Sequence, residues 1–125
     1  MDGRWSFVVP GRPVPAARMT QRSKYRRGGR EERHLVQKQV IGWEARAARL
    51  PELEGPVRLS CVFHVSGRQP DLKNLIALVE DALTGIGYRD DAQIAEYGQM
   101  QRLKCSKAEE RTEITLEPTS EPADL

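Results

Sequence analysis

Residues 57–65, VRLSCVFHV, alternate in character and constrain the fold more than any other stretch of the chain. Successive side chains of a strand point to opposite faces of a sheet, so a period of two indicates one buried face. The apolar set on that face comprises Val57, Leu59, Cys61, Phe63 and Val65. The pattern therefore predicts a sheet that other elements cover on one side.

A helix is expected soon after this strand, beginning at Asp71. An aspartate at the N-cap can accept a backbone N–H from the first turn, and Gly85 and Gly87 are suitable terminators. Asp71, Asn74 and Asp81 fall together along one flank of the helix. Its apolar stripe recurs at helical spacing and comprises Leu72, Leu75, Ile76, Val79, Ala82 and Leu83.

Other segments complete the predicted order of elements. Residues 5–9, WSFVV, are β-branched and aromatic, which is typical of a strand. Residues 92–103 and 111–118 also have strand character, and we expect these two strands to form a hairpin. Residues 31–50 predict a helix that Pro51 ends, with an apolar stripe formed by Val36, Val40, Trp43, Ala47 and Leu50.

The resulting order, β-α-β-α-β-β, predicts an α+β domain with a mixed sheet covered by two helices. We expect a single domain over residues 1–117 and a flexible tail over residues 118–125. The 125 residues suffice for one compact core but not for two ordinary domains. No apolar run approaches the roughly 18–20 residues that cross a bilayer, and the N-terminus lacks the features of a secretory signal, so we expect a cytoplasmic protein.

The cysteines and histidines do not form a metal-binding pattern. Cys61 and Cys105 are far apart in the sequence, and neither belongs to a Cys-x-x-Cys motif. We expect both thiols to be reduced, with Cys61 in the core. His34 and His64 lack partners at ligand spacing, so a structural or solvated role is expected for each.

Positive charge is concentrated in one stretch of the chain. The net charge is only +2, yet residues 12–30 hold seven cations and no acidic residue. Tyr25 lies among these cations, and a ring flanked by positive charge suits stacking on an unpaired base beside phosphate contacts. A solvated arm of no specific role is the alternative. The candidate DNA-binding residues are Arg12, Arg18, Arg22, Lys24, Tyr25, Arg26, Arg27 and Arg30.

Three carboxylates lie at the ends of predicted elements. Asp71 begins a helix, and Asp90 and Asp91 precede a strand. Mg²⁺ prefers oxygen ligands and commonly takes one or two protein carboxylates. We therefore expect Asp71 to lie beside the Asp90-Asp91 pair, of which alternation would direct only one toward the metal. The alternatives are an ordinary N-cap and a polar turn. With the cationic arm, the carboxylates point to metal-assisted phosphodiester cleavage.

The run PDLKNLIALVEDALTGIGYRDDAQI, residues 70–94, resembles the signature of the RusA family of Holliday-junction resolvases. The family pattern is Asp-x-Asp-Asn, a lysine one helical turn later, Asp-Ala-Leu, a glycine-containing turn and Asp-Asp-x-Gln. The opening VVPGRPVPAAR, residues 8–18, is similar to the N-terminal strand and loop of the family. Family members are small α+β homodimers that nick four-way DNA junctions symmetrically, using acidic residues and Mg²⁺.

The resemblance implies a role for each matching position. Asp71, Asn74, Asp81 and Gln93 match family motif residues, and Asp90 and Asp91 match the paired aspartates, the second of which is the essential acid. The implied metal ligands for Mg²⁺, or for Mn²⁺, are Asp71, Asp91, Asp90 and Asp81. The implied catalytic residues are Asp71, Asp91, Asp90 and Lys73. The implied context is DNA recombination and repair in a bacterium or a bacteriophage.

Two positions depart from the pattern: Lys73 replaces the second aspartate, and Ala77 stands where the family has its catalytic lysine. An ammonium repels a divalent cation strongly in a partly dry cleft. Three alternatives remain open. Lys73 takes over the work of the missing lysine, the protein binds junctions without cutting them, or the metal is held with lower affinity. For the dimer surface, Trp43 and Val62 are candidates, although we expect both in the core.

Overall fold

The computed structural model of the chain describes residues 3–17 and 29–120. Two short 3-10 helices, η2 (Asp91–Gln93) and η3 (Lys107–Glu109), precede the last two strands. The main elements follow in the order β1 (Trp5–Pro10), α1 (Arg30–Ala47), β2 (Val57–Val65), α2 (Leu72–Leu83), β3 (Ile94–Lys104) and β4 (Arg111–Pro118). The predicted α+β order with a mixed sheet is confirmed.

The four strands form one sheet in the order β1-β4-β2-β3. β2 runs parallel to β3, whereas β4 is antiparallel to both β1 and β2. The expected hairpin of the last two strands is therefore wrong, because β2 separates β3 from β4. The buried side chains of β4 are Thr112, Ile114 and Leu116, at alternate positions.

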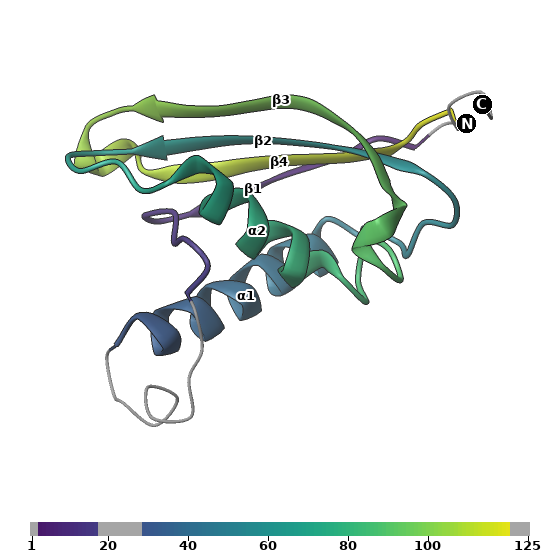
Figure 1. Cartoon of the computed structure of the whole chain (residues 1–125), viewed down its shortest axis with the longest axis horizontal. Coiled ribbons are helices and arrows are strands. Elements are labelled where there is room, and N and C mark those ends of the chain that lie inside the picture. The colour runs from purple at the N-terminus through teal and green to yellow at the C-terminus, as the bar shows by residue number, and fades with distance from the viewer. Residues whose placement is uncertain (1–2, 18–28, 121–125) are drawn as a thin grey trace.

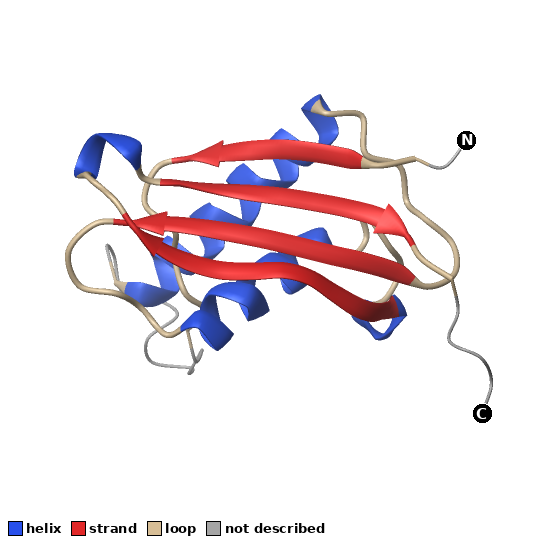
Figure 2. Cartoon of the chain, turned by 90° about the horizontal axis from the view of Figure 1, so that it is seen from above, coloured by secondary structure: helices blue, strands red, loops and turns tan. Residues whose placement is uncertain are grey.

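Both helices cover the same face of the sheet and leave the opposite face without a helix (Figures 1 and 2). The core lies between these layers. β2 contributes the alternate residues that its pattern predicts, and α2 contributes its apolar stripe. The buried side chains of α2 are Leu75, Leu78, Val79, Ala82 and Leu83. Full burial of an aliphatic side chain contributes about 1.5–3 kcal/mol, so this contact fixes α2 against the sheet.

The face that α1 buries differs from the predicted one. Trp43 is 62% exposed and Val36 is 51% exposed, although both belong to the apolar stripe expected in the core. The buried positions of the helix are instead Glu31, His34, Gln37, Ile41 and Ala45. Val62, also expected in the core, is half-buried on the face of the sheet without helices. The apolar stripe of α1 is therefore largely a surface feature.

The ends of the helices follow from local backbone conformation. α1 ends before Pro51, because Arg49 adopts a left-handed conformation and the N–H of Leu50 donates to the carbonyl of Ala45. After α2, Gly85 has a φ of 87°, which an L side chain rarely tolerates. Within the described residues, no helix is both long enough and apolar enough to span a bilayer.

Candidate active site

Asp71 caps the first turn of α2. Its carboxylate Oδ1 accepts the backbone N–H of Lys73 at 2.9 Å. This contact satisfies one of the N–H groups that a helix leaves unpaired at its start. The side chain is otherwise exposed to solvent. The predicted N-cap role is confirmed, and the contact uses one face of one carboxylate oxygen, which leaves the other oxygen open to a ligand.

A cavity beside Asp71 brings together three parts of the chain. Its lining comprises residues 14–17, the α1 residues Glu31 and Arg33, and the segment that contains Pro70, Asp71 and Asn74. The carbonyl of Asn74 accepts the backbone N–H of Ala16 at 2.8 Å. Residues 14–17 belong to the cationic stretch 12–30, so the beginning of that stretch lies against the first turn of α2.

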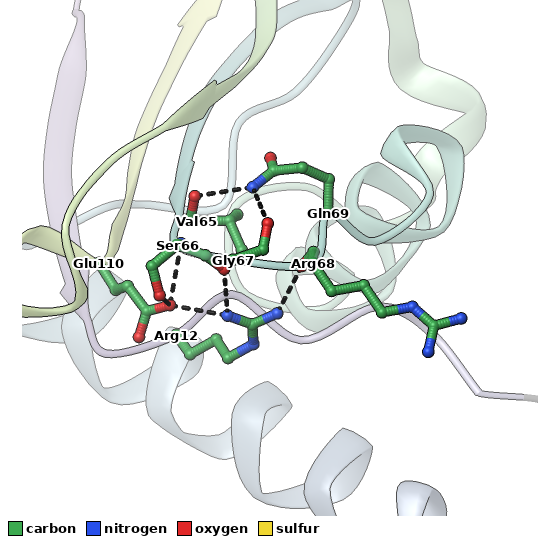
Figure 3. Close-up of polar contacts among 7 residues, drawn as sticks. All are labelled: Arg12, Val65, Ser66, Gly67, Arg68, Gln69 and Glu110. Carbon is green, nitrogen blue, oxygen red and sulfur yellow. Dashed lines mark hydrogen bonds and ion pairs between the residues drawn. The ribbon is translucent and has the colours of Figure 1, made fainter.

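The loop that leads from β2 to Asp71 is held by Arg12 and Glu110 (Figure 3). Arg12 donates to the carbonyls of Ser66 at 2.8 Å and Arg68 at 2.7 Å, and to Glu110 Oε2 at 2.8 Å. The same carboxylate oxygen accepts the N–H and the hydroxyl of Ser66. Gln69 donates to the carbonyls of residues 65 and 67. These contacts fix the loop and with it the position of Asp71.

Hydrogen bonds from Ser66 and, secondarily, Arg12 lower the pKa of the Glu110 carboxyl. Arg12 was expected to contact DNA, and that role stays a prediction. The structure gives it a bracing role that sequence patterns did not reveal, because its partners lie more than 50 positions away in the chain.

Two cations are placed near the first turn of α2. The side chain of Lys73 is exposed on that turn, and Ala77 follows one turn later on the same side of the helix. Arg102 of β3 donates to the carbonyl of Pro70, next to Asp71. Its partner in the strand register is Phe63, a core residue, so Arg102 leaves β3 on the face that carries the helices. Sequence reasoning missed Arg102 because the partner of β3 was assigned wrongly.

Asp90 and Asp91 have different local roles. Asp90 caps η2, and its carboxylate accepts the N–H of Ala92 at 2.9 Å. Gln93 Oε1 accepts the backbone N–H groups of Arg89 and Asp90, and its Nε2 donates to two carbonyls of the loop after α1. Asp91 is exposed, and its carboxylate accepts no hydrogen bond from the residues that the structure describes. Of the pair, Asp91 is thus the freer to bind a ligand.

Glu80 connects α2 to the region around Asp91. The hydroxyl of Tyr97 bonds the carboxylate of Glu80, and the buried Tyr88 donates to the Glu80 carbonyl at 2.7 Å. The bond to Glu80, with burial and with the charges of Glu80 and Asp91, raises the pKa of Tyr97 to about 12. Burial, with the same two charges, raises the pKa of Tyr88. The charge of Asp91 therefore acts on Tyr88 and Tyr97, the two tyrosines that bond Glu80 of α2.

The acids expected to form one pocket do not converge within a single chain. Asp91 shortly precedes Ile94, which pairs with Val57 at the start of β2, whereas Asp71 follows the end of β2, next to Pro70, whose carbonyl accepts from Arg102 near the end of β3. The 12-residue helix α2, about 18 Å long, runs between the two acids in the chain. Asp81 instead pairs with Lys38 of α1 at 2.6 Å. Across residues 3–17 and 29–120, no three His, Cys, Asp or Glu side chains are grouped closely enough to hold a metal ion. The expectation that Asp71 lies beside Asp91 is wrong for one chain, because α2 separates them.

A model of the family described as endodeoxyribonuclease RusA matches residues 10–117. The chain belongs to the RusA family. Among curated proteins, a search finds no match. The match begins at the last residue of β1, includes α1, β2, α2 and β3, and ends one residue before the end of β4. It confirms the resemblance that the sequence motif indicated.

Within the RusA family pattern, the structure explains two motif residues by local bonding. Gln93 anchors the segment between α2 and β3, and Asp90 caps η2. Asp71 and Asp91 remain exposed at the two ends of α2. The two departures from the pattern, Lys73 and Ala77, both lie on the N-terminal half of that helix, close to Asp71.

Most of the candidate DNA-binding residues of this RusA chain lie outside the described residues. These are Arg18, Arg22, Lys24, Tyr25, Arg26 and Arg27. Arg30 is the first residue of α1, and its side chain is also outside the description. Their assignment stays a prediction from sequence.

Proposed function

We propose that this chain is a structure-selective, Mg²⁺-dependent endodeoxyribonuclease that resolves four-way DNA junctions by symmetric nicking. Membership of the RusA family supports the class of reaction. The observation that carries the proposal for this chain is the cavity that Asp71 shares with residues 14–17. It joins the first acid of the family pattern to the start of the cationic stretch, so a phosphate held by that stretch lies near a carboxylate.

The donor groups suit a hard divalent cation, but one chain does not supply them together. Asp71 and Asp91 are exposed carboxylates, which are the ligands that Mg²⁺ takes from proteins. A bound divalent ion supplies activation of water and withdrawal of charge from the phosphate. Because α2 separates the two acids, we propose that Asp71 of one copy works with Asp91 of a second copy. Asp90 and Asp81 would support this site from its edge.

A two-fold axis that crosses α2 near its middle would bring about this pairing. Such an axis places the N-terminal end of one helix beside the C-terminal end of the other. Apolar surface beside α2 is available to stabilise the dimer. Leu35 and Trp43 of α1 are exposed, and they line one groove with Asp81, Thr84 and Ile86 from α2 and the turn that follows it. A symmetric dimer also presents two equivalent sites to two strands of a junction.

The remaining groups act on the DNA by charge. Residues of the cationic stretch would neutralise backbone phosphates and make binding sensitive to salt. Tyr25 would stack on an unpaired base. Lys73 is exposed on the first turn of α2 and Arg102 contacts the carbonyl of Pro70 just before it, where both would offset negative charge on the scissile phosphate. The hydrogen bonds of Arg12 and Glu110 to the loop before α2 would keep Asp71 in position.

The second candidate is a catalytically degenerate protein that binds branched DNA. Lys73 and Ala77 favour it, since an acid and a lysine of the family pattern are both missing. The two candidates differ in a simple test with a labelled four-way junction and Mg²⁺ or Mn²⁺. Cleavage by the wild-type protein supports the nuclease. Tight, salt-sensitive binding without cleavage, together with cleavage by a Lys73→Asp, Ala77→Lys double variant, supports the degenerate site.

A matched pair of variants then tests the assignment of Asp91. Asp91→Asn should reduce cleavage by more than the roughly 10–100-fold that loss of an outer-shell partner costs, and it should leave junction binding within a few-fold. Asp90→Asn retains an acceptor for the N–H of Ala92 and should reduce cleavage much less. Cleavage that survives Asp91→Asn would show that the assignment is wrong.

A further inference from the structure

The first residues of the cationic stretch are attached to both helices by backbone hydrogen bonds. The N–H of Ala16 donates to the carbonyl of Asn74 on α2 at 2.8 Å. The N–H of the next residue, Ala17, donates to the imidazole Nδ1 of His34 on α1 at 2.9 Å. Ala17 is the last residue described before the cations that begin at Arg18. Two consecutive amides thus hold Ala16 and Ala17, the last described residues before those cations, against α2 and α1.

His34 is suited to this contact by its burial and its tautomer. Its side chain is only 7% exposed. An imidazole nitrogen that accepts a hydrogen bond carries no proton, so the ring is neutral and its proton is on Nε2. Burial, followed by the charge of Lys38, lowers the pKa of His34, while the charge of Asp81 raises it. The acceptor form is therefore the stable form at neutral pH.

The contact lies next to the candidate active site. Residues 14–17 line the cavity that also contains Asp71 and Asn74, and Glu31 of α1 completes one side of it. Glu31 and His34 lie one turn apart on α1, and both are buried. His34 is a polar residue on the buried face of α1, where an apolar residue is more usual. The contact to Ala17 gives the buried imidazole a hydrogen-bonding partner.

We infer that His34 is a positioning residue: its Nδ1 holds Ala17 so that the cationic stretch begins beside Asp71 and delivers junction DNA to that carboxylate. The inference rests on the proposed function and deepens it. His34 acts through the backbone of Ala17 and touches neither the DNA nor a metal ion. The position of Ala17 depends on a hydrogen-bond acceptor at residue 34, and not on the charge or the volume of that side chain.

Two variants separate the acceptor from the volume of the side chain. His34→Asn places a carbonyl oxygen close to the position of Nδ1, and His34→Leu has a similar branched shape without an acceptor. In the wild-type protein, NMR should detect a scalar coupling between the Ala17 amide nitrogen and His34 Nδ1 across the hydrogen bond. The Ala17 amide should exchange about fivefold faster in His34→Leu than in wild type, since a hydrogen bond contributes about 1 kcal/mol. In His34→Asn it should stay protected.

Junction affinity, measured on folded variants with matched melting temperatures, tests the consequence. His34→Leu should weaken binding by about tenfold, and His34→Asn should restore it to within about threefold of wild type, as the loss and recovery of one hydrogen bond predict. Equal affinity of all three proteins would overturn the inference, as would an Nδ1 that carries a proton. If His34→Leu does not fold, the scalar coupling in wild type and the junction affinity of His34→Asn still test the inference. A wild-type protein that binds no junction overturns the proposed function, whereas the coupling tests the contact of His34 independently.

Discussion

Asp71 and Asp91 lie at opposite ends of α2, one capping its first turn and the other following its last. The helix between them in the chain has 12 residues and is about 18 Å long. Both residues are exposed to solvent, so both carboxylates are accessible to a ligand. In the RusA family, which cuts DNA with acidic residues, this separation makes a second copy of the chain part of the proposed site.

Trp43→Glu is expected to dissociate the dimer without unfolding the chain. Trp43 is 62% exposed, so its replacement removes little core packing. Sedimentation equilibrium should show a monomer, and the melting temperature should change only through the loss of association. Val62→Glu, on the face of the sheet without helices, is the matched control and should remain dimeric. A dimer lost in Val62→Glu and kept in Trp43→Glu would place the interface on the other face.

Lys73→Asp is expected to stabilise the protein by about 0.3–1 kcal/mol, because a positive charge in the first turn of a helix opposes the helix dipole. Urea unfolding at low salt measures the effect, and Lys73→Gln should give part of the gain. The difference should shrink in high salt, since exposed charges are screened. A destabilised Lys73→Asp variant would show that Lys73 has a favourable partner in the fold.

Gln93→Glu is expected to reduce the free energy of unfolding by about 1–3 kcal/mol, the cost of leaving buried or half-buried polar groups unpaired. The substitution keeps an acceptor for the amides of residues 89 and 90 but loses both donors to the loop after α1. Gln39→Glu, at an exposed position of α1, should change stability by less than about 0.5 kcal/mol. Equal effects of the two variants would contradict the anchoring role of Gln93.

His34 makes stability depend on pH in a defined direction. Its pKa in the folded state is lower than the ordinary value of 6.5, so the unfolded chain binds a proton more readily than the folded one. Stability is therefore fully present above pH 6.5, falls as the pH drops through the interval between the two pKa values, and levels off below the lower one. Thermal melting from pH 8 to pH 5 should show this loss in wild type. His34→Asn should lack that component, and an unchanged profile would contradict the neutral, accepting imidazole.

The sequence predicted well the strand and the helix that have one buried face and a regular hydrophobic period. β2 and α2 have strict periods, and their limits and buried residues are close to those expected. The partner of β4 could not be predicted, because alternation shows that a strand has a buried face but not which strands adjoin it. The buried face of α1 was assigned wrongly for a related reason. His34 is buried there and accepts the amide of Ala17 from another segment, a contact that a hydrophobic period does not record.

For the candidate site, the sequence predicts which acids take part, but it did not predict how the fold arranges them. The motif containing Asp71 and Asp91 was recognised from spacing along the chain. The same spacing places the two acids before and after one helix, but it does not give the distance between them in the fold. The brace between Arg12 and Glu110 joins residues nearly a hundred positions apart, and no local pattern marks it.

The most direct test of the shared site is to combine two inactive variants in one dimer. Asp71→Asn and Asp91→Asn chains, co-expressed with different tags and purified as the heterodimer, are incubated with a labelled four-way junction and Mg²⁺. If Asp71 works with Asp91 of the other copy, one of the two sites has both acids. The heterodimer should then nick one strand, although neither homodimer cuts. A heterodimer as inactive as its parents, beside a wild-type protein that cuts, would contradict the shared site.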